Sequence, residues 1–197
     1  MQALPQSQPK KRVKKTRHPI PVKKTYTVEE WEQLPESPRY ELYDGELLMF
    51  ARPLTVHIRI EIALASEIYA YLKGKKCEVL PEPNLRLDAR RQTVFEPDIV
   101  VVCDPAKVTD NYVVGAPDLV IEILSPSTAG RDRVLKLNAY KDAGVLEYWI
   151  VDPVHKTVEV FLWKETQVPF QYESTDKIKV GIFDDLEIDL KTIFRET

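Results

Sequence analysis

Residues 118–124, with the sequence DLVIEIL, decide the fold because they are apolar along nearly their whole length. Continuous apolar runs of this kind are typical of strands that are covered on both faces of a sheet. Residues 94–102 and 146–151 carry similar runs and also predict buried strands. We therefore expect a buried sheet in which residues 118–124 form a central strand.

Two short elements are expected before this sheet. Thr27 and Glu30 have the spacing of a capping box and predict the start of a short helix. Polar and apolar residues then alternate over residues 40–50 around the dipeptide Asp44-Gly45. This pair readily adopts the positive φ angles of a tight turn, so the segment predicts a hairpin.

Helices are expected on either side of the strands. Apolar residues recur every four positions over residues 56–72, and Gly74 follows as a stop. A second helix is predicted over residues 131–143, where Gly144 ends it. Prolines interrupt residues 77–87, which favours an edge strand or a bulge. The expected order is helix, three strands, helix, strand.

The remaining sequence adds a strand over residues 158–163 and a terminal extension over residues 178–194. No internal repeat and no second core are evident. A chain of 197 residues with 44% apolar residues is long enough to bury a full core. We therefore predict one α/β domain over residues 25–197, with a mixed central sheet flanked by helices.

Residues 1–24 differ from the rest of the chain in charge. They hold eight of the 28 Lys and Arg residues and none of the 31 Asp and Glu residues, so the rest carries a net charge of −11. The segment has too little apolar surface to fold and predicts a disordered basic arm. Such an arm could bind phosphates of a nucleic acid or could simply keep the protein in solution.

The sequence also bears on the compartment. It has no run of about 18 apolar residues that would span a membrane, and its basic start lacks the apolar stretch of a secretory signal. We therefore expect a cytoplasmic protein without a membrane partner. Cys77 and Cys103 lie in apolar segments without the spacing of a zinc or redox site, which predicts two buried thiols.

Glu122 requires a chemical explanation because an ionised carboxylate inside an apolar strand is costly unless it is paired or bound to a metal. A structural ion pair with a buried Arg, or exposure at a sheet edge, would each provide one. Asp98, however, begins another apolar strand directly after Pro97. Two neighbouring strands that each present a carboxylate favour a site for Mg²⁺ or Mn²⁺, since no Cys or His cluster argues for zinc.

Several longer motifs resemble the Uma-two family of predicted endonucleases, which belongs to the PD-(D/E)XK superfamily. The motifs are YELYDGEL at 40–47, EPD at 96–98, GAPDLVIEILSPST at 115–128 and GVLEYWIVDP at 144–153. The resemblance spans nearly everything after the basic arm. It implies a restriction-endonuclease-like fold and a nuclease site that contains Asp98 and Glu122.

One position departs from the superfamily pattern. Leu124 occupies the place where the pattern has a lysine. Lys136, on the following helix, is our candidate for the displaced lysine, with Arg133 and Tyr140 on the same helical stripe and Val134, Leu135 and Leu137 packing on the sheet. The alternative is a solvated lysine that pairs with Asp132, four residues earlier.

Glu41 and His57 are second-tier candidates that could reach the metal or its water. Glu41 alternates with Tyr40 and Leu42 on the hairpin, so it lies on their opposite face. The alternatives are a surface carboxylate for Glu41 and a hydrogen-bonded structural histidine for His57. Pro117-Asp118 is expected only to begin its strand.

These residues predict metal-assisted hydrolysis, and the resemblance implies that the bonds cleaved are nucleic-acid phosphodiesters. Asp98 and Glu122 would hold Mg²⁺ or Mn²⁺, and Lys136 would orient the attacking water. The expected partner is nucleic acid, with DNA preferred, and a homodimer is compatible with the sequence. Two alternatives stay open: a catalytically silent module that binds nucleic acid or protein, and a hydrolase of another phosphodiester.

Overall fold

The computed structural model describes residues 25–126, 128–166 and 168–195. The predicted basic arm, residues 1–24, lies outside the described residues. The central sheet has six strands. In spatial order they are β10 (Phe170–Glu173), β9 (Thr157–Leu162), β8 (Glu147–Asp152), β7 (Leu119–Ile123), β5 (Ile99–Val102) and β3 (Glu78–Pro81).

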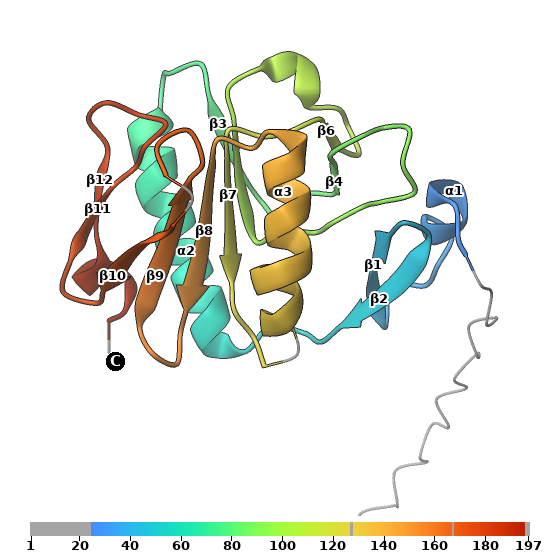
Figure 1. The fold of residues 1–197 in the computed structure, drawn as a ribbon, viewed down its shortest axis with the longest axis horizontal. Coiled ribbons are helices and arrows are strands. Elements are labelled where there is room, and N and C mark those ends of the chain that lie inside the picture. Colours follow the sequence, from blue (N-terminus) through green and yellow to red (C-terminus); the bar gives the residue numbers. More distant parts are fainter. Residues whose placement is uncertain (1–24, 127, 167, 196–197) are drawn as a thin grey trace, which may run out of the picture.

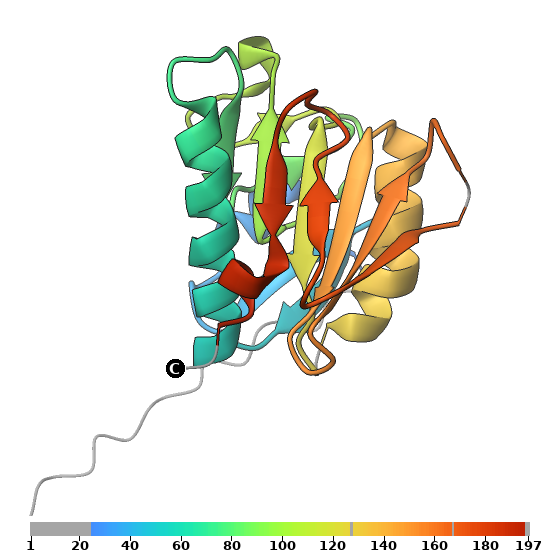
Figure 2. The same ribbon diagram turned by 90° about the vertical axis from the view of Figure 1, so that its left-hand side faces the viewer.

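The strand β7 is central, as predicted. It pairs in parallel with β8 and antiparallel with β5, so the sheet is mixed. Figures 1 and 2 show α2 (Thr55–Leu72) on one face of this sheet and α3 (Leu137–Ala143) on the other. Odd-numbered residues of β7 pack in the core beneath α2, and Val120 packs beneath α3. Glu122, an even-numbered residue, therefore faces α3.

The predicted N-terminal helix and hairpin are both present. Thr27 caps α1 (Val28–Trp31) through a capping box with Glu30. The hairpin consists of β1 (Arg39–Tyr43) and β2 (Glu46–Phe50), and both turn residues between these strands have positive φ angles. Figure 1 shows these elements projecting from one side of the sheet.

The predicted strand over residues 94–102 is shorter in the structure, because its first half pairs elsewhere. Val94 exchanges two backbone hydrogen bonds with Leu42 of β1, at 2.8 and 2.9 Å, and Phe95 exchanges two with Leu85 of β4 (Leu85–Arg86). Pro97 separates this half from β5, since it has no backbone N–H to donate to the ladder. The hairpin is thereby attached next to the beginning of β5.

The predicted helix over residues 131–143 is divided into two parts. Residues Arg131–Lys136 form a π-helix, α3 follows, and Gly144 ends it with a φ of 89°. Leu135 and Leu137 pack on the core beneath α3, but Val134 is 62% exposed, so its predicted packing is wrong. The wider π-helical turn shifts the side chains away from the positions that a regular 3.6-residue period assigns.

The C-terminal segment covers the α2 face of the sheet. It contains β11 (Lys177–Lys179), β12 (Glu187–Asp189) and α4 (Leu190–Ile193), and its apolar residues join the core beneath α2. The strand β10 was not predicted from the sequence. Two short elements, η1 (Pro105–Lys107) and β6 (Val113–Val114), complete the fold.

The prediction of two buried thiols is wrong. Cys77 and Cys103 are joined by a disulfide, and both are only half-buried. The antiparallel register pairs Glu78 with Val102. Cys77, directly before Glu78, therefore lies opposite Cys103, directly after Val102, and their Cα atoms are 3.9 Å apart. A separation of 26 residues in sequence does not specify this register. None of the helices in the described ranges is both long and apolar enough to cross a bilayer.

Candidate active site

The candidate site lies where β5 begins, β7 ends and the π-helical segment starts. The register between β5 and β7 pairs Ile99 with Ile121 and Val100 with Val120. One step further along this ladder, Asp98 lies opposite Glu122. Opposite residues of an antiparallel pair direct their side chains to the same face, with Cβ atoms about 5 Å apart. The fold therefore brings the two predicted carboxylates together.

Lys136 reaches the same place from the helix. Its Nζ lies 2.9 Å from Oε1 of Glu122 and 2.7 Å from Oε1 of Glu41. All three side chains are almost completely buried, at 2–3% exposure. The ammonium group is thus held between a carboxylate of the sheet and a carboxylate of the hairpin. The alternative of a solvated lysine is excluded, although Asp132 does lie 3.6 Å from Nζ.

Asp98 is oriented by two donors. Its Oδ2 accepts a hydrogen bond of 2.5 Å from the backbone N–H of Ile123, and its Oδ1 lies 3.1 Å from Nε2 of His57. Burial opposes protonation of His57, but the hydrogen bond to Asp98 and the charges of Asp98 and Glu61 together outweigh it and raise the pKa of this imidazole. The second-tier residue His57 therefore contacts a predicted metal ligand.

Glu41 also points into the site, and the alternative of a surface carboxylate is wrong. The hairpin carries it there, because β1 is attached to the segment before β5. The same Oε1 that contacts Lys136 accepts a hydrogen bond of 3.0 Å from the backbone N–H of Glu96. Arg39, two residues before Glu41, contacts Glu96 and Glu82 at the outer side of the site.

Burial and charge act in opposite directions on the central groups. Burial raises the pKa of Glu122 well above its usual range, and the attraction of Lys136 only partly opposes this. For Lys136, burial lowers the pKa, but the carboxylates of Glu122 and Glu41 outweigh it and raise the pKa well above the ordinary value. Tyr140 donates a hydrogen bond of 2.7 Å to Oε1 of Glu122 and fixes that oxygen further.

These side chains surround a cavity of about 50 Å³. Its charged lining consists of Glu41, Glu82, Glu96, Asp98, Glu122, Asp132, Lys136 and Arg39, with His57 beside them. Carboxylates outnumber the fully charged basic groups, and Oδ1 of Asp132 is buried without a hydrogen-bond partner. The cavity has room for an ion with one or two of its waters.

The donor set fits Mg²⁺ or Mn²⁺. Within the described ranges, no three Asp, Glu, His or Cys side chains form a ready-made cation cage. Mg²⁺, however, is usually held by only one or two carboxylates and retains several waters. Asp98 and Glu122 would supply such a pair, while Lys136 already neutralises part of the negative charge.

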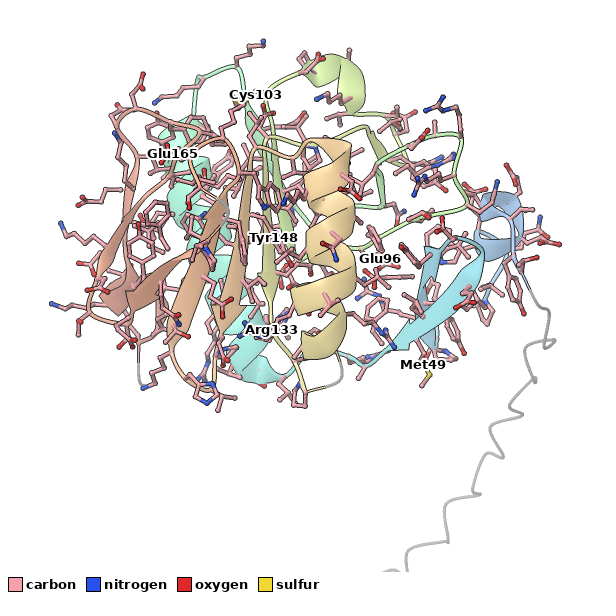
Figure 3. The ribbon with its side chains drawn as sticks, in the orientation of Figure 1. Met49, Glu96, Cys103, Arg133, Tyr148 and Glu165 are labelled. Atoms are coloured by element: carbon pink, nitrogen blue, oxygen red, sulfur yellow. A yellow bond between two sulfur atoms is a disulfide. The ribbon has the colours of Figure 1, made fainter. Side chains whose placement is uncertain are left out.

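Arg133 does not belong to the site. It contacts Glu159 on β9 and lies 3.7 Å from Asp152 at the end of β8. The π-helical segment directs Asp132 and Lys136 into the cavity. Arg133 instead points toward β8 and β9. Figure 3 shows Arg133 near the start of the helical segment that leads into α3, apart from Glu96 on the hairpin side.

Sequence reasoning missed Glu61, which follows His57 by one helical turn on α2. It is 9% exposed and lines a larger groove beside the cavity. Burial, followed by the charges of Asp98 and Glu82, raises the pKa of Glu61 to about 7. The spacing of four residues from His57 is the signal that could have identified it.

We expect Glu61→Gln to raise the free energy of unfolding by about 1–3 kcal/mol at pH 8 and to leave it unchanged near pH 4. Below about pH 4.5 the carboxyl group of Glu61 is mainly neutral in both the folded and the unfolded protein. Between pH 4.5 and 7 it loses its proton mainly in the unfolded state, so the native protein loses stability as pH rises, and glutamine avoids this loss.

Urea unfolding of both proteins at pH 4, 6 and 8 measures the effect. Glu67→Gln serves as the control, since Glu67 is exposed on the same helix. An equal difference between wild type and Glu61→Gln at pH 4 and pH 8 would show that ionisation of Glu61 is not the cause.

The model of the Uma2 family, described as "Putative restriction endonuclease", matches residues 28–191. The chain belongs to the Uma2 family. The match includes Glu41, His57, Asp98, Glu122 and Lys136, so the whole candidate site lies within the Uma2 domain. Membership indicates a nuclease and confirms the resemblance seen in the sequence.

Individual proteins are also similar to this chain. The chain is 26% identical to the uncharacterized Synechocystis protein slr1290 over 77% of its own length and 80% of the relative. It is 29% identical to the uncharacterized Synechocystis protein sll1609, over 60% and 69% of the two lengths. The chain also resembles the crystal structure of an Anabaena variabilis protein described as a putative nuclease, with a TM-score of 0.70, 24% identity and coverage of 85% of this chain and 97% of the other. This likeness confirms the restriction-endonuclease-like fold.

Proposed function

We propose that this protein is a divalent-metal-dependent endonuclease that hydrolyses phosphodiester bonds, with DNA as the preferred substrate. The supporting observation is the convergence of Asp98 and Glu122 from neighbouring strands beside the buried ammonium group of Lys136. Such an arrangement combines hard oxygen donors with a fixed positive charge. A metal ion held by the carboxylates and the ammonium group would each stabilise the negative charge that develops on the phosphate in the transition state.

Asp98 and Glu122 would hold the metal ion. When bound, Mg²⁺ or Mn²⁺ supplies Lewis-acid chemistry and lowers the pKa of a bound water. The chain's own residues do the positioning. His57 and the N–H of Ile123 fix the Asp98 carboxylate, and Tyr140 fixes that of Glu122.

Lys136 orients the attacking water or contacts a phosphate oxygen. Its position does not depend on Glu122 alone, since Glu41 also holds its Nζ. Lys136 thereby replaces the lysine that the superfamily pattern has at the position of Leu124. Leu124 itself is buried in the core beneath α3, so it does not reach the cavity.

A second candidate function is a binding module that keeps the fold without catalysis. The observation that favours it is the ion pair between Lys136 and Glu122, in which the ammonium group contacts a carboxylate oxygen that a metal ion would use. In such a module the buried charges would only stabilise the fold. Nucleic acid or protein would bind elsewhere on the surface.

Cleavage assays with Asp98→Asn distinguish these functions. We expect the wild-type chain to cut DNA with Mg²⁺ or Mn²⁺ and to lose this activity in EDTA. Asp98→Asn should cut at least about a hundredfold more slowly, because the lost ligand weakens metal binding. Plasmid and end-labelled single-stranded, duplex and RNA substrates measure the rates and the substrate preference.

Asp184→Asn is the matched control, since Asp184 is exposed and lies outside the cavity lining. It should cut at the wild-type rate. Equal metal-dependent cleavage by Asp98→Asn and Asp184→Asn would reject Asp98 as a ligand. Absence of any metal-dependent cleavage by pure wild-type protein would favour the binding module.

A further inference from the structure

A large groove of about 1600 Å³ lies beside the candidate site, between the β1–β2 hairpin and the segments around it. Figure 3 shows Met49 and Glu96, which both line this groove, on the hairpin side of the molecule. Trp31, Phe50 and Tyr112 contribute aromatic surface to the lining. The cavity of the candidate site itself is much smaller, at about 50 Å³.

The charge of this groove is predominantly negative. Its lining contains two arginines, Arg39 and Arg52, and six carboxylates. The carboxylates are Glu32, Glu36, Glu61, Glu82, Glu96 and Asp110. Arg39 is already paired with Glu82 and Glu96. A phosphate backbone would be repelled by this lining, whereas a cationic segment would be attracted.

The chain carries a cationic segment that lies only a few residues in sequence from the groove lining. Residues 1–24 contain eight Lys and Arg residues and no Asp or Glu. The described chain begins directly afterwards, and the backbone N–H of Tyr26 is bound at 2.7 Å to the carbonyl of Gly45 in the hairpin turn. Trp31, five residues further on, already lines the groove. The basic segment is therefore joined to the groove lining by only a few residues of fixed chain.

Tethering makes even a weak attraction sufficient. For an unfolded segment, as the composition predicts, the eight to fifteen residues between the basic cluster at 10–17 and Thr25 span roughly 15–20 Å on average. A tether of this length gives an effective concentration on the order of 1 mM. An attraction with a Kd of about 1 mM would thus dock the segment about half of the time.

We propose that residues 1–24 dock intramolecularly in this acidic groove. The basic segment then neutralises the carboxylates of the groove beside the candidate site. Exposed carboxylates such as Glu32, Glu36 and Asp110 provide the contacts, since their exposure leaves them accessible to lysine and arginine side chains. The proposal concerns binding within the chain and does not rest on the nuclease function.

Zero-length carbodiimide cross-linking of the full chain tests this proposal. The reagent joins lysines to carboxylates that are in contact, and peptide mass spectrometry identifies the pairs. We expect links from the lysines at 10–15 to Glu32, Glu36 or Asp110 to exceed links to the exposed control residues Asp142, Glu173 and Asp184 by at least about fivefold. The excess should disappear in 1 M NaCl, where the Debye length falls to about 3 Å.

A mixture of ¹⁴N- and ¹⁵N-labelled protein identifies which chain donates the segment. Links within one isotope support docking in the same molecule, whereas a majority of mixed pairs would overturn the proposal in favour of a second copy. An even distribution over groove and control carboxylates would also overturn it. The triple variant Glu32→Gln, Glu36→Gln, Asp110→Asn should abolish the excess of cross-links to the remaining carboxylates of the groove. Neutralising the three control residues Asp142, Glu173 and Asp184 should leave the cross-links to the groove unchanged.

Discussion

Replacing Lys136 with methionine is expected to lower the free energy of unfolding by about 3–5 kcal/mol at pH 8. The substitution keeps a side chain of similar length but leaves the buried carboxylates of Glu122 and Glu41 without their counter-charge. The loss should be smaller at pH 5. Burial already raises the pKa of Glu122, and without Lys136 this carboxyl group takes up a proton more readily as pH falls.

Urea or thermal unfolding at both pH values measures this loss. Lys179→Met is the matched control, because Lys179 is exposed on β11. The double variant Lys136→Met, Glu41→Gln should recover part of the stability, since it removes one of the unpaired charges. A loss below about 1 kcal/mol, equal to that of the control, would contradict the buried ion network.

Replacing Glu122 with glutamine is expected to reduce metal-dependent cleavage at least about a thousandfold while changing stability by less than about 1 kcal/mol. Loss of a carboxylate ligand removes several kcal/mol of transition-state stabilisation, and about 4 kcal/mol corresponds to a thousandfold. The fold should persist because glutamine keeps the shape, and Lys136 retains Glu41 as a partner.

Rates on DNA with Mg²⁺ and unfolding without metal separate these two effects. Glu173→Gln, an exposed carboxylate on β10, is the control for both measurements. Unchanged cleavage would remove Glu122 from the site. A loss of several kcal/mol in metal-free stability would instead show that the ion pair of Glu122 with Lys136 serves mainly to stabilise the fold.

The sequence predicts most of the fold because local patterns and burial agree there. The apolar run of residues 118–124 predicts a buried strand, the four-residue periodicity of residues 56–72 predicts a helix, and Asp44-Gly45 predicts a hairpin turn. The structure contains all three, as β7, α2 and the β1–β2 turn. Where two patterns compete, the prediction fails. Residues 94–102 look like one strand, but Pro97 divides them between two pairings.

The candidate site is less predictable because it depends on register and helix geometry. Asp98 and Glu122 follow from two buried strands, but Glu41 could not be placed, since nothing local shows that the hairpin docks beside β5. The π-helical turn moves Lys136 toward the cavity and Val134 toward solvent. The disulfide likewise depends on the pairing of β3 with β5.

The most direct test is a crystal structure of the protein soaked in Mn²⁺, with the ion located by its anomalous scattering. We predict a peak at coordination distance from carboxylate oxygens of both Asp98 and Glu122, with Lys136 retained by Glu41. The same soak of Asp98→Asn should lack the peak. An ion bound elsewhere, with the contact between Lys136 and Glu122 intact and the cavity free of metal, would contradict the proposed metal centre.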